Sequence, residues 1–242
     1  MSENTLTPMV SAPAVSAPTL LVTWQNPESR TYFLMGHVAQ TDQGLYEFTY
    51  FPGVDQQPGF RSIPGFPDTS ATYSSTVLFP LFSSRLMSDR RPDRKEWLDS
   101  HGLDEDAPDL TVLGRSLGRR VADRFEFYPE PDIDMTARTV VAEVPLHGLR
   151  YHPEGLTALD IGRLHTGDPL HVIPEPLNAH DARALGVHLS DGTKIGFVPR
   201  PLLDYLDRGG LLGGAPTALA AHVNPRLYGF HERVILRVAW TL

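Results

Sequence analysis

Short aromatic and β-branched runs separated by turn residues constrain the fold of this 242-residue chain more than any other feature. Residues 20–24, 31–38 and 45–51 are three such runs, and Asn26-Pro27 and Asp42-Gln43-Gly44 stand between them. Runs of this length and composition, bounded by turn residues, are typical of antiparallel strands. The sequence therefore predicts a meander of about three strands at the start of the fold.

A proline- and glycine-rich stretch follows between Phe51 and Pro80, and it predicts irregular structure. Apolar spacing and helix-start residues then favour helices at residues 75–87 (crossed by Pro80), 92–98 and 109–121, and a short strand at 125–128. Pro129-Glu130-Pro131-Asp132 is typical of a linker, so we place a boundary near residues 130–137.

The part of the chain after this boundary is richer in strand-like runs. They lie at residues 139–146, 168–176, 183–189, 194–198, 216–223 and 233–240, with helical or irregular chain at 156–164 and a helix starting at Pro201. The turn Ser190-Asp191-Gly192 predicts a hairpin between two of them. Five or six strands with one or two helices in about 105 residues is the number expected for a small closed barrel.

The predicted fold class is therefore mixed α/β, mostly β. It consists of a disordered arm over residues 1–18, an α+β module over residues 19–131 and a β-barrel over residues 137–242. The arm is assigned because this segment is rich in Ser, Ala and Pro and has little to bury.

Charge is distributed unevenly between the two parts. The net charge of the chain is −8, but residues 1–136 hold 11 basic and 19 acidic residues, whereas residues 137–242 hold 10 of each. Phosphate binding is mainly an effect of Lys and Arg, so the acidity of the whole chain argues against nucleic acid. The second part is neutral and has to be judged separately.

Several classes of protein are excluded or disfavoured by the composition. The absence of cysteine excludes disulfide frameworks, thiol catalysis and cysteine-ligated zinc. No apolar run approaches the roughly 20 residues needed to cross a bilayer, and the first 18 residues lack the features of a secretory signal. We therefore expect a cytoplasmic protein without a membrane partner.

The common catalytic and cofactor motifs are mostly missing. The sequence contains no P-loop or HExxH motif, and its histidines show no metal-ligand spacing. The glycine-rich segment 209–214 is typical of a flexible loop, because no strand and helix flank it in the way a phosphate-binding loop requires. We expect no metal and no cofactor, and we favour a protein that is not an enzyme.

Two groups of basic residues lie in the acidic first part. Arg115 and Arg119 have the i, i+4 spacing of one helix face, with Arg120 beside them, and a second group spans Arg90 to Lys95. Acidic residues lie between the two groups in sequence, which favours a solvated face with ion pairs. Arg115, Arg119 and Arg120 are nevertheless our candidates for binding an acidic partner.

Residues 148–200 hold the most informative polar and aromatic residues. Arg150 and Tyr151 place a cation beside a ring on which a base can stack, and stacking is worth roughly 1–3 kcal/mol per base. Asn178 and Asp181 offer an amide and a carboxylate to a sugar or base edge. The residues alone leave open a second interpretation, in which Asn178 and Asp181 cap a turn and Tyr151 belongs to the core.

Residues 138–240 resemble a HIRAN domain, which occurs alone in bacteria and at the front of eukaryotic SWI/SNF-type helicases. The resemblance rests on three segments in matching order and spacing: GLRYH (148–152), EPLNAHD (175–181) and KIGFVPR (194–200). It implies a six-stranded OB-like barrel that captures the 3′ end of single-stranded DNA. It also implies that residues of the first segment stack on terminal bases, and that the Asn-and-Asp turn holds the terminal nucleotide.

Carried over by position, the implied DNA-binding residues are Arg150, Tyr151, His152, Asn178, Asp181, Phe197 and Arg200. His152 and Phe197 depart from the best-understood member, which has a phenol and a histidine there. Selectivity for a free 3′-hydroxyl is therefore in question, although stacking can survive both changes. A carboxylate at Asp181 would repel phosphate, which fits recognition of a hydroxyl end.

Residues 20–128 are similar to the N-terminal lobe of HipA-type toxin kinases, through segments such as FPLFSSRL (79–86) and LTVLGRSLGRR (110–120). This resemblance implies a protein-interaction module, and no kinase core follows it. The leading hypothesis is a non-enzymatic binder of single-stranded DNA ends in repair or defence. The alternatives are a regulatory factor whose barrel does not bind DNA and, third, a metal-dependent hydrolase acting on nucleic acid.

Overall fold

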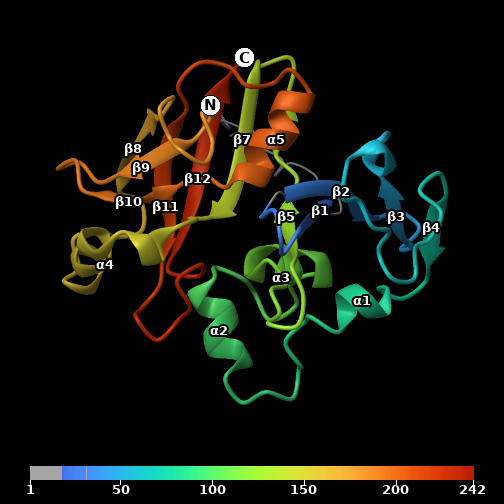
Figure 1. Cartoon of the computed structure of the whole chain (residues 1–242). Helices are drawn as coiled ribbons and strands as arrows, with labels where there is room; N and C mark the ends of the chain where they lie inside the picture. The colour runs from blue at the N-terminus through green and yellow to red at the C-terminus, as the bar shows by residue number, and fades with distance from the viewer. Residues whose placement is uncertain (1–17, 31) are drawn as a thin grey trace, which may run out of the picture.

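Two antiparallel sheets form the framework of the chain, which was analysed as a computed structural model describing residues 18–30 and 32–242. The fold is mixed α/β and mostly β, as the sequence predicts, with short helices around the sheets (Figure 1). The predicted disordered arm lies outside the described residues, except for Pro18. Among the described residues, no helix has the length and apolar character needed to span a membrane.

The first sheet has five strands in the order β4-β3-β2-β1-β5. Its strands are β1 (Leu20–Gln25), β2 (Tyr32–Gln40), β3 (Tyr46–Tyr50), β4 (Thr72–Ser75) and β5 (Phe125–Pro129). The first three are the predicted meander. β4 corrects the prediction of irregular structure up to Pro80, because Thr72–Ser75 pairs with β3 despite the many prolines nearby.

The second sheet has seven strands in the order β10-β9-β8-β11-β12-β7-β6. Its strands are β6 (Asp132–Asp134), β7 (Thr139–Pro145), β8 (Pro169–Pro174), β9 (Leu185–His188), β10 (Lys194–Phe197), β11 (Thr217–Val223) and β12 (Val234–Thr241). The predicted hairpin is β9 and β10, and Gly192 in its turn has a φ of 88°. A positive φ is readily available to glycine, which explains the strong turn signal.

The predicted six-stranded closed barrel is not confirmed, because no closed barrel is found among the described strands. The physical reason lies at β7, where one edge pairs with β12 and the other pairs with β6. Among the described residues, a single isolated bridge links the two sides of the sheet, between His147 just after β7 and Phe197 of β10.

The helices are α1 (Pro80–Ser83), α2 (Arg94–Ser100), α3 (Asp109–Ser116), α4 (Pro153–Asp160) and α5 (Arg200–Arg208), with 3-10 turns η1 (Val54–Gln56) and η2 (Leu149–Tyr151). Two of the predicted helices are clearly shorter in the structure. The helix expected over 75–87 is a single turn that starts at Pro80, whose ring fits the first helical position. The helix expected to reach Val121 ends at Ser116, because Leu117 and Gly118 adopt positive φ values of 57° and 54°.

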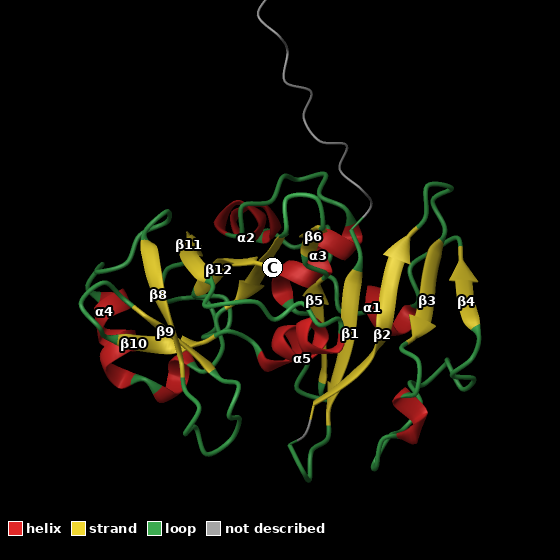
Figure 2. Ribbon diagram, turned by 90° about the horizontal axis from the view of Figure 1, so that it is seen from above, coloured by secondary structure: helices red, strands yellow, loops and turns green. Residues whose placement is uncertain are grey.

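The two sheets are packed against each other with α5 between them (Figure 2). On α5, Tyr205 contacts the ring of Phe51 and its hydroxyl bonds to Glu130, while Arg208 donates to the carbonyl of Pro52. The hydrophobic core of the second sheet includes Leu21, Leu117 and Tyr128 of the first part. The second sheet is therefore buried partly by residues that precede the predicted boundary.

Candidate nucleic-acid interface

The turn η2 presents Arg150 and Tyr151 to solvent. Gly148 starts this turn with a φ of 79°, a conformation that glycine adopts readily, and the buried Leu149 anchors it to the core. Tyr151 is 66% exposed and therefore does not belong to the core. The Arg150 guanidinium lies 4.6 Å from the centre of the Tyr151 ring and donates to its hydroxyl.

Phe197 provides a second ring, at the end of β10. Its backbone exchanges two hydrogen bonds with His147, of 3.0 and 2.8 Å, which fix the end of β10 against the chain that leads into η2. The His152 ring lies 5.6 Å from the Phe197 ring. The Lys194 ammonium lies 3.9 Å from the centre of the Phe197 ring, on the same strand.

His152 is held in its neutral form by its surroundings. Burial is the largest cause that lowers its pKa, and the nearby charge of Lys194 lowers the pKa further. Its Nε2 atom is buried and has no hydrogen-bond partner among the described residues. A buried polar atom without a partner is costly, and a hydrogen bond from a ligand would relieve that cost.

Asn178 and Asp181 cap the turn that joins β8 to β9. The Asn178 Oδ1 accepts hydrogen bonds from the backbone N–H groups of His180 (3.0 Å) and Asp181 (3.3 Å). The Asp181 Oδ1 accepts one from the N–H of Arg183 (2.9 Å). Turn capping, one of the two interpretations that the residues leave open, thus describes these side chains in the free chain.

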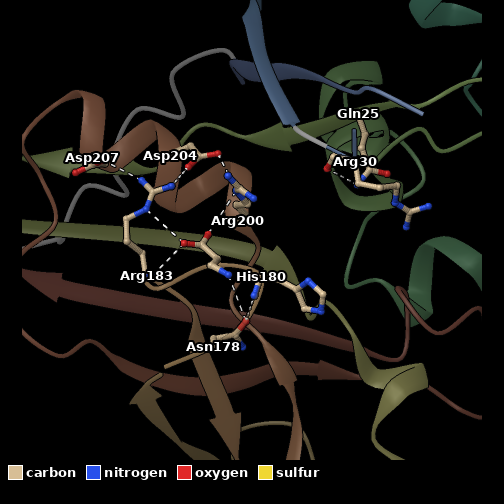
Figure 3. A network of polar contacts seen from close by, with 9 residues as sticks. Gln25, Arg30, Asn178, His180, Arg183, Arg200, Asp204 and Asp207 are labelled. Atoms are coloured by element: carbon tan, nitrogen blue, oxygen red, sulfur yellow. Dashed lines mark hydrogen bonds and ion pairs between the residues drawn. The ribbon is translucent and has the colours of Figure 1, made fainter. Parts of the chain in front are cut away.

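An ion-pair network surrounds Asp181. Figure 3 shows its two arginines, Arg183 and Arg200, beside Asp204 and Asp207. Its carboxylate lies 3.4 Å from Arg200 and 3.6 Å from Arg183. Both arginines also contact Asp204 on α5, and Arg183 pairs with Asp207 as well. Since three carboxylates face two guanidinium groups here, the positive charge of Arg200 is already compensated within the chain.

Glu175, which the sequence analysis did not select, joins the two halves of this surface. It pairs with Lys194 beside Phe197 and accepts a 3.1 Å hydrogen bond from the Asn178 Nδ2. Burial raises the pKa of Glu175, but the bonds from Lys194 and Asn178 outweigh it and the pKa is lowered. Glu175 and Lys194 open the EPLNAHD and KIGFVPR segments, but their contact has no local signal in the sequence because it depends on strand pairing.

A shallow hollow of about 360 Å³ lies over Glu175, Pro176, Leu177 and Asn178. Leu177 is almost completely exposed at its rim. The arrangement offers two rings, Tyr151 and Phe197, with a cation beside each, and capped polar groups at the adjoining turn. Such a surface suits the bases and phosphates of a single strand better than it suits acid–base catalysis.

The three arginines predicted to bind a partner lie away from this surface. Arg115 forms a 3.2 Å ion pair with Glu143 on β7, and it therefore joins the two parts of the chain. Arg119 pairs with Glu126 at 3.2 Å, and Arg120 donates to the carbonyl of Ser84. Arg119 and Arg120 are both exposed, so a partner can reach them.

The described residues contain no group of three His, Asp or Glu side chains that would hold a metal ion. Residues 140–227 match the family model of the HIRAN domain. This HIRAN domain extends from β7 past β11 and contains every residue of the candidate site, from Arg150 to Arg200.

No curated protein matches the chain. A crystal structure of a protein from Lactobacillus plantarum matches it with 17% sequence identity and a TM-score of 0.30, covering 42% of this chain and 95% of that one. The family-model match over residues 140–227 confirms the HIRAN resemblance predicted from the sequence in the C-terminal part. The resemblance of residues 20–128 to HipA-type kinases is not shown by these matches.

Proposed function

We propose that the HIRAN domain of this chain binds single-stranded DNA at a 3′ end and does so without catalysis. The match to a family whose members generally bind such ends supports a nucleic-acid partner. The observation that carries the proposal for this chain is the pair of rings, Tyr151 and Phe197, each with a cation against its face. Rings beside cations are the usual means of holding single-stranded bases and their phosphates.

In this proposal, each site residue has a definite role. Tyr151 and Phe197 stack on bases, His152 offers its unpartnered Nε2 atom, and Arg150 contacts phosphate. The turn held by Asn178 and Asp181 faces the terminal sugar, while Arg200 contacts phosphate only if it leaves Asp181 and Asp204.

The organisation of the chain follows from the same proposal. Residues 137–242 act as an OB-like unit whose two sides meet at the bridge between His147 and Phe197. Residues 19–131 act as an interaction module whose acidity limits nonspecific binding to DNA, and whose Arg119 and Arg120 meet a protein partner. A cytoplasmic role in repair or defence fits such a protein.

Fluorescence anisotropy tests the proposal with two short oligonucleotides that differ only in a 3′-hydroxyl or a 3′-phosphate. We expect the hydroxyl-ended strand to bind more tightly at modest salt, because the carboxylate of Asp181 repels a terminal phosphate. Equal binding of both strands would leave contacts to bases and backbone and remove the recognition of the end. Failure to bind either strand would overturn the proposal and favour a regulatory factor that does not bind DNA.

A further inference from the structure

Lys194 covers one of the two rings that the proposed function needs. Its ammonium lies 3.9 Å from the centre of the Phe197 ring, and its other partner is Glu175. Only about a quarter of each of these two charged side chains is exposed. In the free chain, Lys194 is therefore held against the ring and is not available to solvent as a free cation.

A glycine on the neighbouring strand makes room for this arrangement. Phe197 pairs with Gly186 across β9 and β10, and Lys194 pairs with His188. A side chain at Gly186 would overlap with the Glu175 carboxylate, which occupies the space beside the strand. Asn178 holds the same carboxylate from the other side, so Glu175 stays in place whether or not Lys194 remains on it.

A base that stacks on the covered face of Phe197 has to take the place of the Lys194 ammonium. Cation–π contacts and ion pairs at partly exposed positions are individually weak, so the displacement is accessible. Lys194 has a flexible four-carbon stem, and the phosphate attached to the stacked nucleotide offers it a new negative partner.

We propose that Lys194 moves from Phe197 and Glu175 to a backbone phosphate when a base stacks on Phe197. Lys194 is then a DNA-contacting residue in the bound state, and Glu175 is the residue that holds it in the free state. This inference rests on the proposed function of the same surface. It adds a phosphate contact next to the second ring, at the first residue of the KIGFVPR segment, which the residues carried over from the HIRAN resemblance do not include.

The salt dependence of binding tests this inference directly. Each phosphate contact to a single strand contributes about 0.7 to the slope of log Kobs against log salt. Both proteins in the comparison are the full chain carrying Glu175→Gln, and one of them also carries Lys194→Met. The loss of Lys194 then leaves no unpaired carboxylate at position 175. Methionine keeps an apolar stem on Phe197, and thermal unfolding of both variants checks that they are folded.

We expect Lys194→Met to reduce the slope by about 0.7 and to weaken binding several-fold. Lys95→Met is the matched control, because Lys95 is the only other lysine, lies on α2 and pairs with Glu105; it should leave the slope unchanged. Glu175→Gln alone should strengthen binding several-fold, because an amide releases Lys194 more easily.

An unchanged slope in Lys194→Met, with clear binding by the wild-type chain, would overturn the role of Lys194 and leave the proposed function intact. The same would follow if Glu175→Gln weakened binding. Absence of binding by the wild-type chain would instead overturn the proposed function and this inference together.

Discussion

Tyr151 combines high exposure with a position that the backbone fixes firmly. Leu149 is buried at the start of the same turn, and the side chain of Arg150 lies against one face of the ring. Large exposed aromatic side chains lose solvent contact and gain stacking when a base covers them. The ring is therefore placed for contact with a ligand, and its removal should cost little stability.

Tyr151→Ala should weaken binding of a 3′-hydroxyl strand by about 1–3 kcal/mol, the value of one stacked base. Tyr151→Phe keeps the ring and loses only the hydroxyl that accepts from Arg150, so it should retain most of the affinity. Anisotropy titrations give both values. Phe230→Ala removes another half-exposed ring, on the loop before β12, and should bind as the wild type does. A wild-type affinity for Tyr151→Ala would place the bases elsewhere.

At the scale of elements, a buried polar chain joins the two sheets near the candidate site. The Tyr128 hydroxyl donates to Glu126 on the same strand β5, and it lies 2.9 Å from the His147 Nε2. A hydroxyl has one proton to donate, so the His147 Nε2 carries the proton that completes the chain. Burial lowers the pKa of His147, in agreement with a neutral ring. Because the backbone of His147 also holds Phe197, β5 supports the base of the site.

Tyr128→Phe removes the hydroxyl between two buried partners and should lower the free energy of unfolding by about 1–3 kcal/mol. It should also weaken DNA binding, since His147 leads directly into η2. Denaturant unfolding and anisotropy measure the two effects. Tyr46→Phe is the control, because the structure gives the Tyr46 hydroxyl no partner among the described residues. If Tyr128→Phe matched this control in both measurements, the buried chain would have no supporting role.

The elements that the sequence predicts well are those with local causes. The strands β1 to β3 follow from alternating aromatic and β-branched residues, and the β9–β10 hairpin follows from Asp191-Gly192. β4 is not predictable in this way, because it lies inside the proline-rich stretch and pairs with β3, which precedes that stretch. The end of α3 is equally hidden, since Leu117 is a non-glycine residue with positive φ.

The same distinction applies to the candidate site. Arg150, Tyr151 and Phe197 are contained in short motifs, and the HIRAN match includes all of them. The contact between Glu175 and Lys194 arises only once β8, β9 and β10 are paired, and 18 residues separate them in the sequence. The compensation of Arg200 by Asp181 and Asp204 also depends on where α5 lies.

At the scale of the whole molecule, histidines concentrate between the two parts of the chain. The buried His101 on the loop after α2 stacks on Trp97 and lies 3.7 Å from Glu232, next to β12. His147 contacts Tyr128, and the ring of His222 lies against Gly102. Contact between the sheets therefore depends on neutral histidines as well as on the shared hydrophobic core.

Five histidines have pKa values below the ordinary 6.5, with burial as the largest cause in each: His101, His147, His152, His222 and His231. The unfolded chain binds protons more tightly at these positions than the folded chain does. Their stabilising effect is therefore complete well above pH 6.5 and is lost as the pH falls through 6.5 toward the lower folded values. The ordinary pKa values of the carboxyl groups lie at 3.8–4.5. Protonation of the histidines therefore dominates the pH dependence of stability between about pH 6.5 and pH 5.

We expect the free energy of unfolding to fall over this window with a slope of up to about 1.4 kcal/mol per pH unit for each such histidine. Denaturant unfolding at several pH values measures the slope. His101→Gln removes a buried ring between α2 and β12. It should therefore reduce the slope by up to about 1.4 kcal/mol per pH unit, the contribution of one proton. His165→Gln, whose side chain is 73% exposed, serves as the control substitution. A flat profile between pH 7.5 and pH 5 would contradict the idea that neutral histidines hold the two sheets together.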